Sequence, residues 1–187
     1  TRFKAGTYEI QSGQHMGDIL TTLTEGVPIL TSVTFPEGKN MFEFGKILED
    51  KNITSYEEFV KECRNPENIR ELGIDAPSLE GYLFPDTYKF APKTPAKLVV
   101  QAMTKLTLKK IKSLDFDSSF LNRHQVMILA SIVEKETGAK KERPTIAGVY
   151  LNRLKKKMRL QADPTTIYGI WEGFDGNLRK KHLLQKT

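Results

Sequence analysis

The chain has 187 residues, of which 39% are hydrophobic and 28% are charged. These values are typical of a globular protein with a real core and do not predict disorder. Lysine and arginine number 29 against 23 acidic residues, and the net charge of +6 favours a polyanion or an anionic membrane surface as a neighbour. The single cysteine excludes an internal disulfide. The longest apolar stretch, residues 126–133, is far shorter than the roughly 20 residues of a membrane helix.

The first 50 residues predict a small α+β unit. Strands are expected at residues 8–10 and 29–35, where β-branched and aromatic residues are concentrated. Helices are expected around residues 19–26 and directly after Asn40, whose side chain can cap a helix start.

The amino-acid composition changes in the middle of the chain. A helix is expected after Ser55, which has capping-box spacing to the glutamate three positions later. Residues 65–95 contain five prolines and two glycines, which indicate loop and inter-domain connection. We therefore expect a domain boundary near residue 78 or 90.

The remainder of the chain has a helical pattern. Apolar residues at helical spacing predict one helix over residues 98–114 and a second from Asn122 to Gly138. A third helix is expected after Pro144, because proline is well placed in a first turn.

The second of these helices ends in EKET, and its two glutamates differ in their position around the helix axis. With Val126 set at zero and about 100° per residue, the apolar residues span an arc from about 200° round to about 40°. Glu136 falls inside this arc at about 280°, and Glu134 falls near its edge at about 80°. The two carboxylates diverge by about 200°, so they cannot flank one bond together.

Glu136 is therefore the candidate general acid. A carboxylate set among aliphatic side chains loses hydration, which raises the pKa toward the range that a proton donor needs. The alternative is a structural helix-end residue that pairs with Arg143 or Arg153. Glu134 is expected to pair at the surface or to support the site by orienting a polar loop.

A second candidate region is MRLQADPTTIYG, residues 158–169, which is expected to be a short loop after a basic helix. Its amide, carboxylate, hydroxyl and aromatic groups match the hydroxyls and the apolar face of a sugar. An equally weighted alternative is a turn that leads into the next element, since aspartate before proline forms turns. The candidate glycan contacts are Gln161, Asp163, Thr165 and Tyr168, with Asn152 and Arg153 supporting the loop from the preceding helix.

Other features indicate packing or exclude chemistry. LEGYLFPDTYKF, residues 79–90, is the densest aromatic stretch, and most of its rings are expected in a core or a domain interface, with one or two left to line a groove. The three histidines are far apart, so no metal site and no cofactor are expected. The sequence has no glycine-rich phosphate loop and no recognisable pairing of a nucleophile with a histidine.

Several segments together closely resemble the endolytic murein transglycosylase (YceG-like) family. The resemblance runs in order over nearly the whole chain, and the combination of EKET with RLQADPT is highly specific. The segments are KAGTYEI at 4–10, EGYLFPDTY at 80–88, ASIVEKETG at 130–138, VYLNRL at 149–154 and RLQADPTTIYG at 159–169.

The resemblance implies a fold and a catalytic residue. The expected fold is α+β, with a small LysM-like module and connecting helices in residues 1–78. A helix-rich, lysozyme-like catalytic domain would occupy residues 79–187, ending before the segment that completes it in the family. The family's catalytic glutamate is the second one of EKET, which is Glu136 here.

The resemblance also implies an activity and a location. Such enzymes are lytic transglycosylases that cut nascent peptidoglycan strands internally between N-acetylmuramic acid and N-acetylglucosamine, leave 1,6-anhydro ends, and so terminate strand elongation. A single-pass helix anchors them in the inner membrane with the catalytic part facing the periplasm, although this chain shows no anchor helix. Peptidoglycan synthases are further candidate partners.

Two other classes of function compete with this interpretation. One is a non-catalytic peptidoglycan-binding or scaffold protein, in which Glu136 only packs. The other is nucleic-acid binding, which rests on net charge alone, because the aromatic residues lie away from the lysine runs and no stacking platform in a basic groove is visible.

Overall fold

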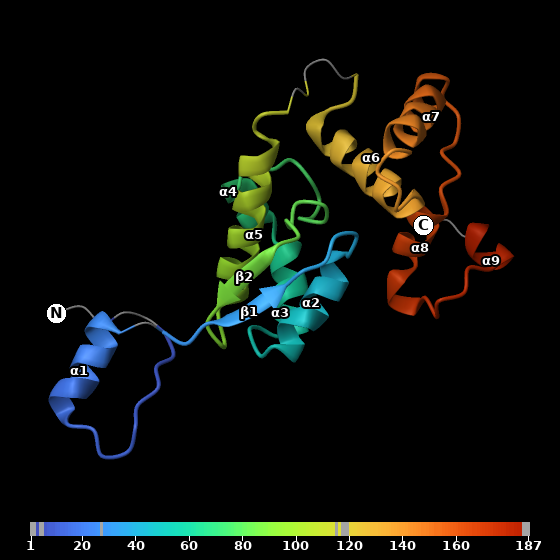
Figure 1. Cartoon of the computed structure of the whole chain (residues 1–187). Coiled ribbons are helices and arrows are strands. Elements are labelled where there is room, and N and C mark those ends of the chain that lie inside the picture. The colour runs from blue at the N-terminus through green and yellow to red at the C-terminus, as the bar shows by residue number, and fades with distance from the viewer. Residues whose placement is uncertain (1–2, 4–5, 27, 115, 117–119, 185–187) are drawn as a thin grey trace. The chain divides into compact units, whose positions relative to one another are not determined.

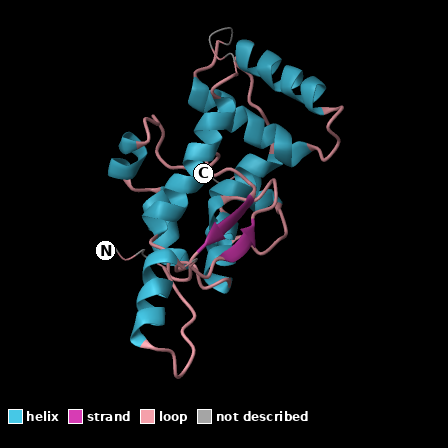
Figure 2. Ribbon diagram, turned by 60° about the vertical axis from the view of Figure 1, so that its left-hand side comes forward, coloured by secondary structure: helices cyan, strands magenta, loops and turns pink. Residues whose placement is uncertain are grey.

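Helices dominate the structure, a computed structural model that describes residues 3, 6–26, 28–114, 116 and 120–184 (Figure 1). Over these residues, two short strands pair in a small sheet (Figure 2), so the expected α+β class is confirmed in this coarse form. In chain order the elements are α1 (Met16–Glu25), β1 (Thr31–Thr34), α2 (Met41–Asp50), α3 (Tyr56–Cys63), α4 (Pro66–Glu71), β2 (Thr87–Phe90), α5 (Ala96–Ile111), α6 (Arg123–Glu136), α7 (Arg143–Lys155), α8 (Asp163–Gly169), the 3₁₀ turn η1 (Trp171–Gly173) and α9 (Lys180–Leu183).

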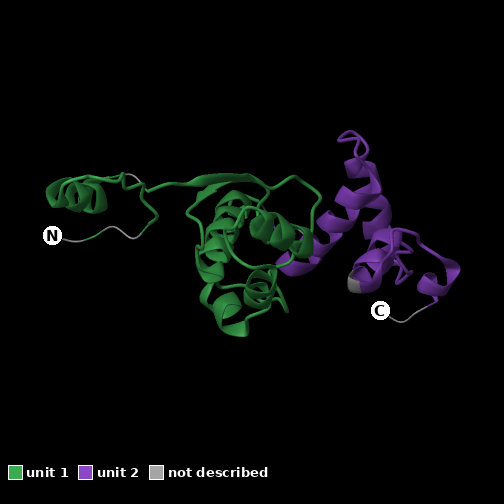
Figure 3. Cartoon of the chain, turned by 90° about the horizontal axis from the view of Figure 1, so that it is seen from below, with its two compact units in different colours: residues 1–114 green, residues 115–187 purple. Residues whose placement is uncertain are grey.

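The chain divides into two compact units, residues 1–114 and 115–187 (Figure 3). This division lies beyond the boundary expected near residue 78. The physical reason is that β1 pairs with β2 and α3 packs against α5, so segments before and after residue 78 share one core. The LysM-like and catalytic roles assigned to residues 1–78 and 79–187 stay predictions.

The core of the first unit forms around the ladder between β1 and β2. The strands are antiparallel, with Thr31 opposite Phe90 and Val33 opposite Tyr88. Val33 is fully buried while Thr34 is exposed, as expected for a strand with one face on a core. Helices supply most of the other fully buried large side chains, among them Met41, Leu48, Phe59, Val99 and Met103.

Three helix starts follow the side chains expected to cap them. Asn40 and Asn122 each form a capping box, at α2 and α6. Ser55 accepts a hydrogen bond from the backbone N–H of Glu58 at the start of α3. These side chains satisfy backbone donors that the helix itself leaves without partners, so the three predictions are confirmed.

Two other predictions in the first unit were wrong. No strand is assigned to residues 8–10, although the Thr7 carbonyl accepts from the Ile29 N–H at 2.7 Å. The proline-rich stretch expected as loop contains α4 and β2. Proline is compatible with the first turn of α4, where its missing N–H has no helical partner to lose, and β2 forms because β1 supplies its ladder.

The second unit is built from α6, α7 and α8. α6 packs against both of the other helices. The core of the second unit contains Leu129, Ile132, Val133, Tyr150 and Ala162. Among the described residues, none of the helices combines the length and the apolar character needed to cross a membrane.

In the first unit, the side chain of Tyr88 links β2 to the loop before it and provides a test of the core around the two strands. Its hydroxyl donates to the Phe84 carbonyl at 2.8 Å, and its ring stacks on Phe90 at 5.7 Å between centroids. Burial, followed by the negative charge of Asp86, raises the pKa of Tyr88 to about 12.

We predict that Tyr88 makes the protein less stable at high pH. Its folded-state pKa lies above the ordinary value of 10.0, so its contribution is complete below pH 10 and is lost as pH rises toward about 12. Urea unfolding between pH 9 and 12 should therefore show a shallower fall in unfolding free energy for Tyr88→Phe than for the wild type. Equal slopes for the two proteins would contradict this assignment.

Candidate functional site

Glu136 is the last residue of α6, one turn beyond the core that this helix forms. Ile132 and Val133, at 5% and 7% exposure, are the last buried residues of the helix. Glu136 itself is exposed, so the expectation that it is held half-dry in an aliphatic stripe was wrong. The wheel gave its direction around the axis but not its position along it, and the core ends before the helix does.

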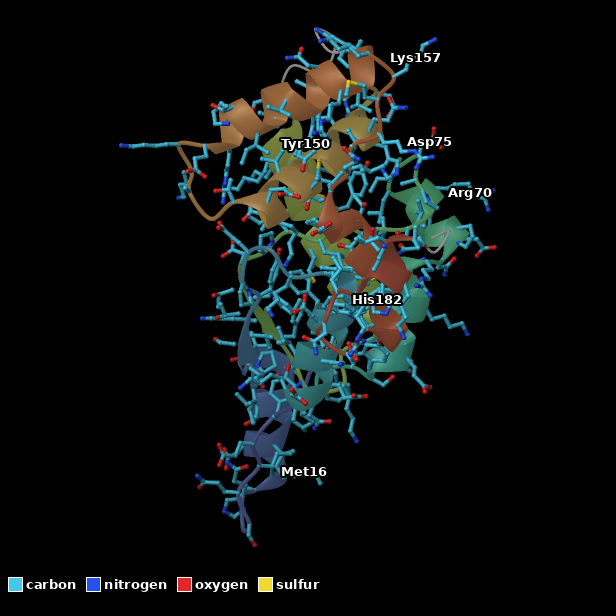
Figure 4. The ribbon with its side chains drawn as sticks, turned by 90° about the vertical axis from the view of Figure 1, so that its right-hand side faces the viewer. Met16, Arg70, Asp75, Tyr150, Lys157 and His182 are labelled. Atoms are coloured by element: carbon cyan, nitrogen blue, oxygen red, sulfur yellow. The ribbon has the colours of Figure 1, made fainter. Side chains whose placement is uncertain are left out.

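Tyr150 on α7 lies beside Glu136. Its side chain is only 7% exposed and belongs to the core of the second unit (Figure 4). The Glu136 carboxylate acts on its hydroxyl and raises the pKa of Tyr150. Nothing in the sequence pattern indicated Tyr150 as a site residue.

Charge around Tyr150 shows which residues meet at this point. Burial raises the pKa of Tyr150, and the Glu136 carboxylate raises it further. The cation of Arg153 opposes this rise, and the carboxylate of Asp163 adds to it. The charges of Glu136, Arg153 and Asp163 thus all act on this one phenol.

Glu134 lies outside this group. Its carboxylate pairs with the guanidinium of Arg143 at 2.9 Å, with both side chains about one-third exposed. The expected divergence of the two glutamates is therefore present, and Arg143 pairs with Glu134 rather than with Glu136. An ion pair with this exposure contributes about 0–1 kcal/mol to stability.

The chain reverses directly after α7. The Met158 N–H donates to the Arg153 carbonyl at 2.9 Å and the Lys157 N–H donates to the Leu154 carbonyl at 3.0 Å, which is the hydrogen-bond pattern of a Schellman motif. Lys157 has a φ of 53°, in the left-handed region that this motif requires. The reversal returns residues 159–161 to the side of Arg153.

Arg153 holds the returning segment. Its Nη1 atom donates to the Leu160 carbonyl at 2.6 Å and to Oε1 of Gln161 at 3.3 Å. The contact expected between Arg153 and this segment is therefore present. Gln161 has a φ of 53°, which costs a non-glycine residue roughly 1–2 kcal/mol, so its conformation depends on such contacts. Asn152, the other residue expected to support the segment, is exposed.

The expected loop at residues 158–169 is only partly a loop. Asp163 opens α8 and Pro164 lies in its first turn, where both residue types are compatible with a helix start. The Thr165 hydroxyl donates to the Ala162 carbonyl at 2.7 Å, and Tyr168 is 40% exposed. The alternative of a turn leading into a new element describes this backbone better, and the sugar contacts stay predictions.

The aromatic stretch at residues 79–90 lies in the first unit. Tyr82 and Phe90 are buried, at 2% and 8% exposure, so the prediction that most of these rings pack in a core is confirmed for them. Lys110 lies over the ring of Phe84 at 5.8 Å.

Charge is unevenly divided between the two units. Residues 1–114 contain 15 basic and 15 acidic residues, whereas residues 115–187 contain 14 basic and 8 acidic residues. Much of the excess lies at the end of α7, where Lys155, Lys156, Lys157 and Arg159 are all exposed and Lys157 projects outward (Figure 4).

Within the described ranges, no three His, Cys, Asp or Glu side chains are placed to hold a metal ion.

A model of the YceG-like family matches residues 1–187. The chain belongs to the YceG-like family. It is similar to the endolytic murein transglycosylase of Bacillus subtilis (strain 168), with 30% identity over 196 residues that cover 95% of this chain and 54% of that protein. The endolytic murein transglycosylase of Streptococcus pneumoniae serotype 2 (strain D39 / NCTC 7466) is 28% identical over 90% of this chain and 36% of its own length.

The fold is also similar to a solved member of the YceG-like family. A crystal structure of a YceG-like protein from Listeria monocytogenes matches with a TM-score of 0.74 and 27% identity, over 99% of this chain and 67% of that chain. This chain spans about half of the length of the Bacillus relative and about a third of the Streptococcus relative.

We predict that replacing Glu136 by glutamine lowers the pKa of Tyr150 in this YceG-like protein. The variant removes the negative charge that opposes ionisation of the phenol, while the burial that also raises the pKa remains. An NMR titration of the tyrosine ring carbons measures the change. Glu142→Gln is the matched control, because this exposed glutamate lies in the same unit and accepts from the Thr137 hydroxyl instead. An unchanged Tyr150 titration in Glu136→Gln would mean that the two side chains are not in contact.

Proposed function

We propose that this protein is a peptidoglycan lytic transglycosylase in which Glu136 is the acid and base. The observation that carries the proposal is the accessible Glu136 carboxylate at the end of α6, in the same unit as the segment that Arg153 fixes. The relatives named endolytic murein transglycosylases support the reaction class. Their names apply to proteins longer than this chain.

One carboxyl group is sufficient for this reaction. Glu136 donates its proton to the glycosidic oxygen between N-acetylmuramic acid and N-acetylglucosamine while the bond from C1 to that oxygen breaks. The resulting carboxylate then takes the proton of the C6 hydroxyl of the muramic acid residue, whose oxygen bonds to C1. The product is a 1,6-anhydro ring, the acid is regenerated, and no water is consumed, so the second carboxylate of ordinary glycosidases is not needed.

Exposure of Glu136 changes how the acid is prepared for this chemistry. In the free protein, water reaches the carboxyl group, and the aliphatic core lies one turn away. A glycan strand bound across Gln161, Asp163, Thr165 and Tyr168 would cover Glu136 and remove this water. Bound substrate would then remove water from the Glu136 carboxyl group, in place of the aliphatic core residues that the helix pattern had predicted to do so.

The finer features of the family belong to the same proposal. They comprise a LysM-like role for the N-terminal residues, termination of strand elongation, an inner-membrane anchor with the catalytic part facing the periplasm, and peptidoglycan synthases as partners. The resemblance in sequence supports them.

Glu136→Gln tests the proposal directly. We expect the rate of formation of anhydro-muropeptides from murein sacculi, measured by mass spectrometry, to fall by about 100-fold or more, because removal of a general acid and base typically costs that much. Glu57→Gln removes the same charge from an exposed position on α3 and should retain the wild-type rate.

Two results would point to a different function. Equal product from Glu136→Gln and the wild type would mean that another group supplies the proton. Retention of sacculi by both proteins with no product from either would indicate the rival function, a peptidoglycan-binding protein.

The excess positive charge of residues 115–187 fits a substrate whose peptides carry carboxylates. We predict that replacing Lys155, Lys156 and Lys157 together by glutamine weakens binding to peptidoglycan strands in cosedimentation at low salt. The difference should shrink at about 1 M salt, where the Debye length is about 3 Å. Replacing the exposed Lys105, Lys109 and Lys112 in the same way changes the net charge equally and is the control. Equal losses for the two triple variants would indicate a response to total charge alone.

A further inference from the structure

The end of α7 carries positive charge with no acidic residue in the same stretch. From the first turn of α7 to the residue before α8, residues 144–162 contain five basic residues and no acidic residue. Four of the five follow one another closely at the end of the helix and are exposed, and Lys157 projects outward (Figure 4). This stretch therefore attracts polyanions and anionic membrane surfaces alike.

Met158 is an apolar residue in the middle of this basic stretch, and it is 53% exposed. It follows Lys157 in the Schellman motif, at the position whose apolar side chain frequently packs against the last turn of the helix. That turn presents Asn152 and Arg153, both polar, and Met158 stays exposed. Helix capping therefore does not account for an apolar side chain at this position.

Phe120 is a second exposed apolar residue next to the same stretch. It precedes α6 and is 54% exposed. The Nζ atom of Lys155 lies over its ring, 5.4 Å from the centroid, so the chain before α6 and the end of α7 are adjacent. We call Phe120, Met158 and the exposed basic residues 155–157 and 159 the basic tip.

An anionic lipid surface offers both kinds of contact that the basic tip can make. Lipid phosphates lie above the boundary of the acyl chains, so lysines can pair with phosphates while neighbouring apolar side chains enter that boundary. The long lysine stems span this depth. A glycan strand has little apolar surface for a methionine, and Lys155 already covers one face of the Phe120 ring, the kind of surface that stacks on a sugar.

We propose that the basic tip binds an anionic lipid surface, with Phe120 and Met158 at the acyl boundary and the lysines of residues 155–157 at the phosphates. The inference goes beyond the proposed function and does not depend on Glu136. It adds a membrane contact that the second unit makes itself. Such a contact is reversible, because two apolar side chains bury far less surface than a helix that crosses the membrane.

Cosedimentation with vesicles tests the charged part of the tip. The probes are vesicles of phosphatidylglycerol mixed with phosphatidylcholine and vesicles of phosphatidylcholine alone, and we expect the wild type to sediment with the anionic vesicles only. Replacing Lys155, Lys156 and Lys157 together by glutamine should weaken this binding about tenfold or more, since each lysine near an anionic surface strengthens binding about fivefold. The triple variant of Lys105, Lys109 and Lys112 is again the control for net charge.

The apolar pair distinguishes a lipid surface from other polyanions. We expect Phe120→Gln combined with Met158→Gln to weaken binding to anionic vesicles about tenfold or more, because both side chains lose the apolar boundary. Cosedimentation with peptidoglycan strands should stay as in the wild type. Phe3→Gln combined with Met16→Gln is the matched control, because it makes the same change of composition at positions that are 62% and 72% exposed. This control should retain vesicle binding.

Four results would overturn the inference. The first is a wild type that does not sediment with anionic vesicles. The second is unchanged vesicle binding by the Phe120 and Met158 double variant, which would mean that charge alone acts. The third is loss of peptidoglycan binding by that variant with vesicle binding unchanged, which would assign the tip to the glycan strand. The fourth is an equal loss in the matched control, which would indicate a response to total hydrophobicity.

These readouts are separate from those of the proposed function. None of them measures catalysis, so the assay of anhydro-muropeptides from Glu136→Gln can fail while the lipid contact stands, and the reverse also holds. All variants are made in the full chain, and thermal unfolding of each distinguishes a lost contact from a lost fold.

Discussion

The packing of α6 against α7 is the constraint on which the site depends. Leu129, Ile132 and Val133 bury one face of α6, and Tyr150 is the residue of α7 that completes this core. The same tyrosine carries the hydroxyl whose pKa the Glu136 carboxylate raises. Core packing and site geometry are therefore set by one side chain: any shift of α7 along α6 moves the hydroxyl relative to the carboxylate. Such a shift is costly because protein interiors are closely packed.

The part of the site that can be predicted from sequence is the part that depends on local chemistry. Capping residues fixed the starts of α2, α3 and α6, since a side chain and a backbone N–H three positions apart meet in any helix. The helix period separated Glu134 from Glu136 for the same reason. The period contains no information about how far along its axis a helix stays covered, and so the exposure of Glu136 could not be foreseen.

The remaining misses arise from contacts between distant segments. β2 lies in a stretch rich in proline and glycine and becomes a strand because β1, 53 residues earlier at the Thr34–Thr87 pair, supplies its partners. α8 begins at an Asp-Pro pair that is equally compatible with a turn. The left-handed conformation of Lys157 was also invisible, because glycine or asparagine usually marks such a position. Without that reversal, the contact between Arg153 and Leu160 has no geometric basis.

The distribution of charge around Glu136 follows from these same local reversals. Arg153 is the cation whose charge reaches Tyr150, and its Nη1 donates to the returning backbone, so its charge is partly engaged there. Lysines that contribute to the excess charge of the second unit follow at the end of α7, where they are exposed, and Lys157 projects outward (Figure 4). Under the proposed function, the exposed lysines at the end of α7 would attract an anionic strand through their long-range charge, while Arg153 fixes the backbone of residues 159–161.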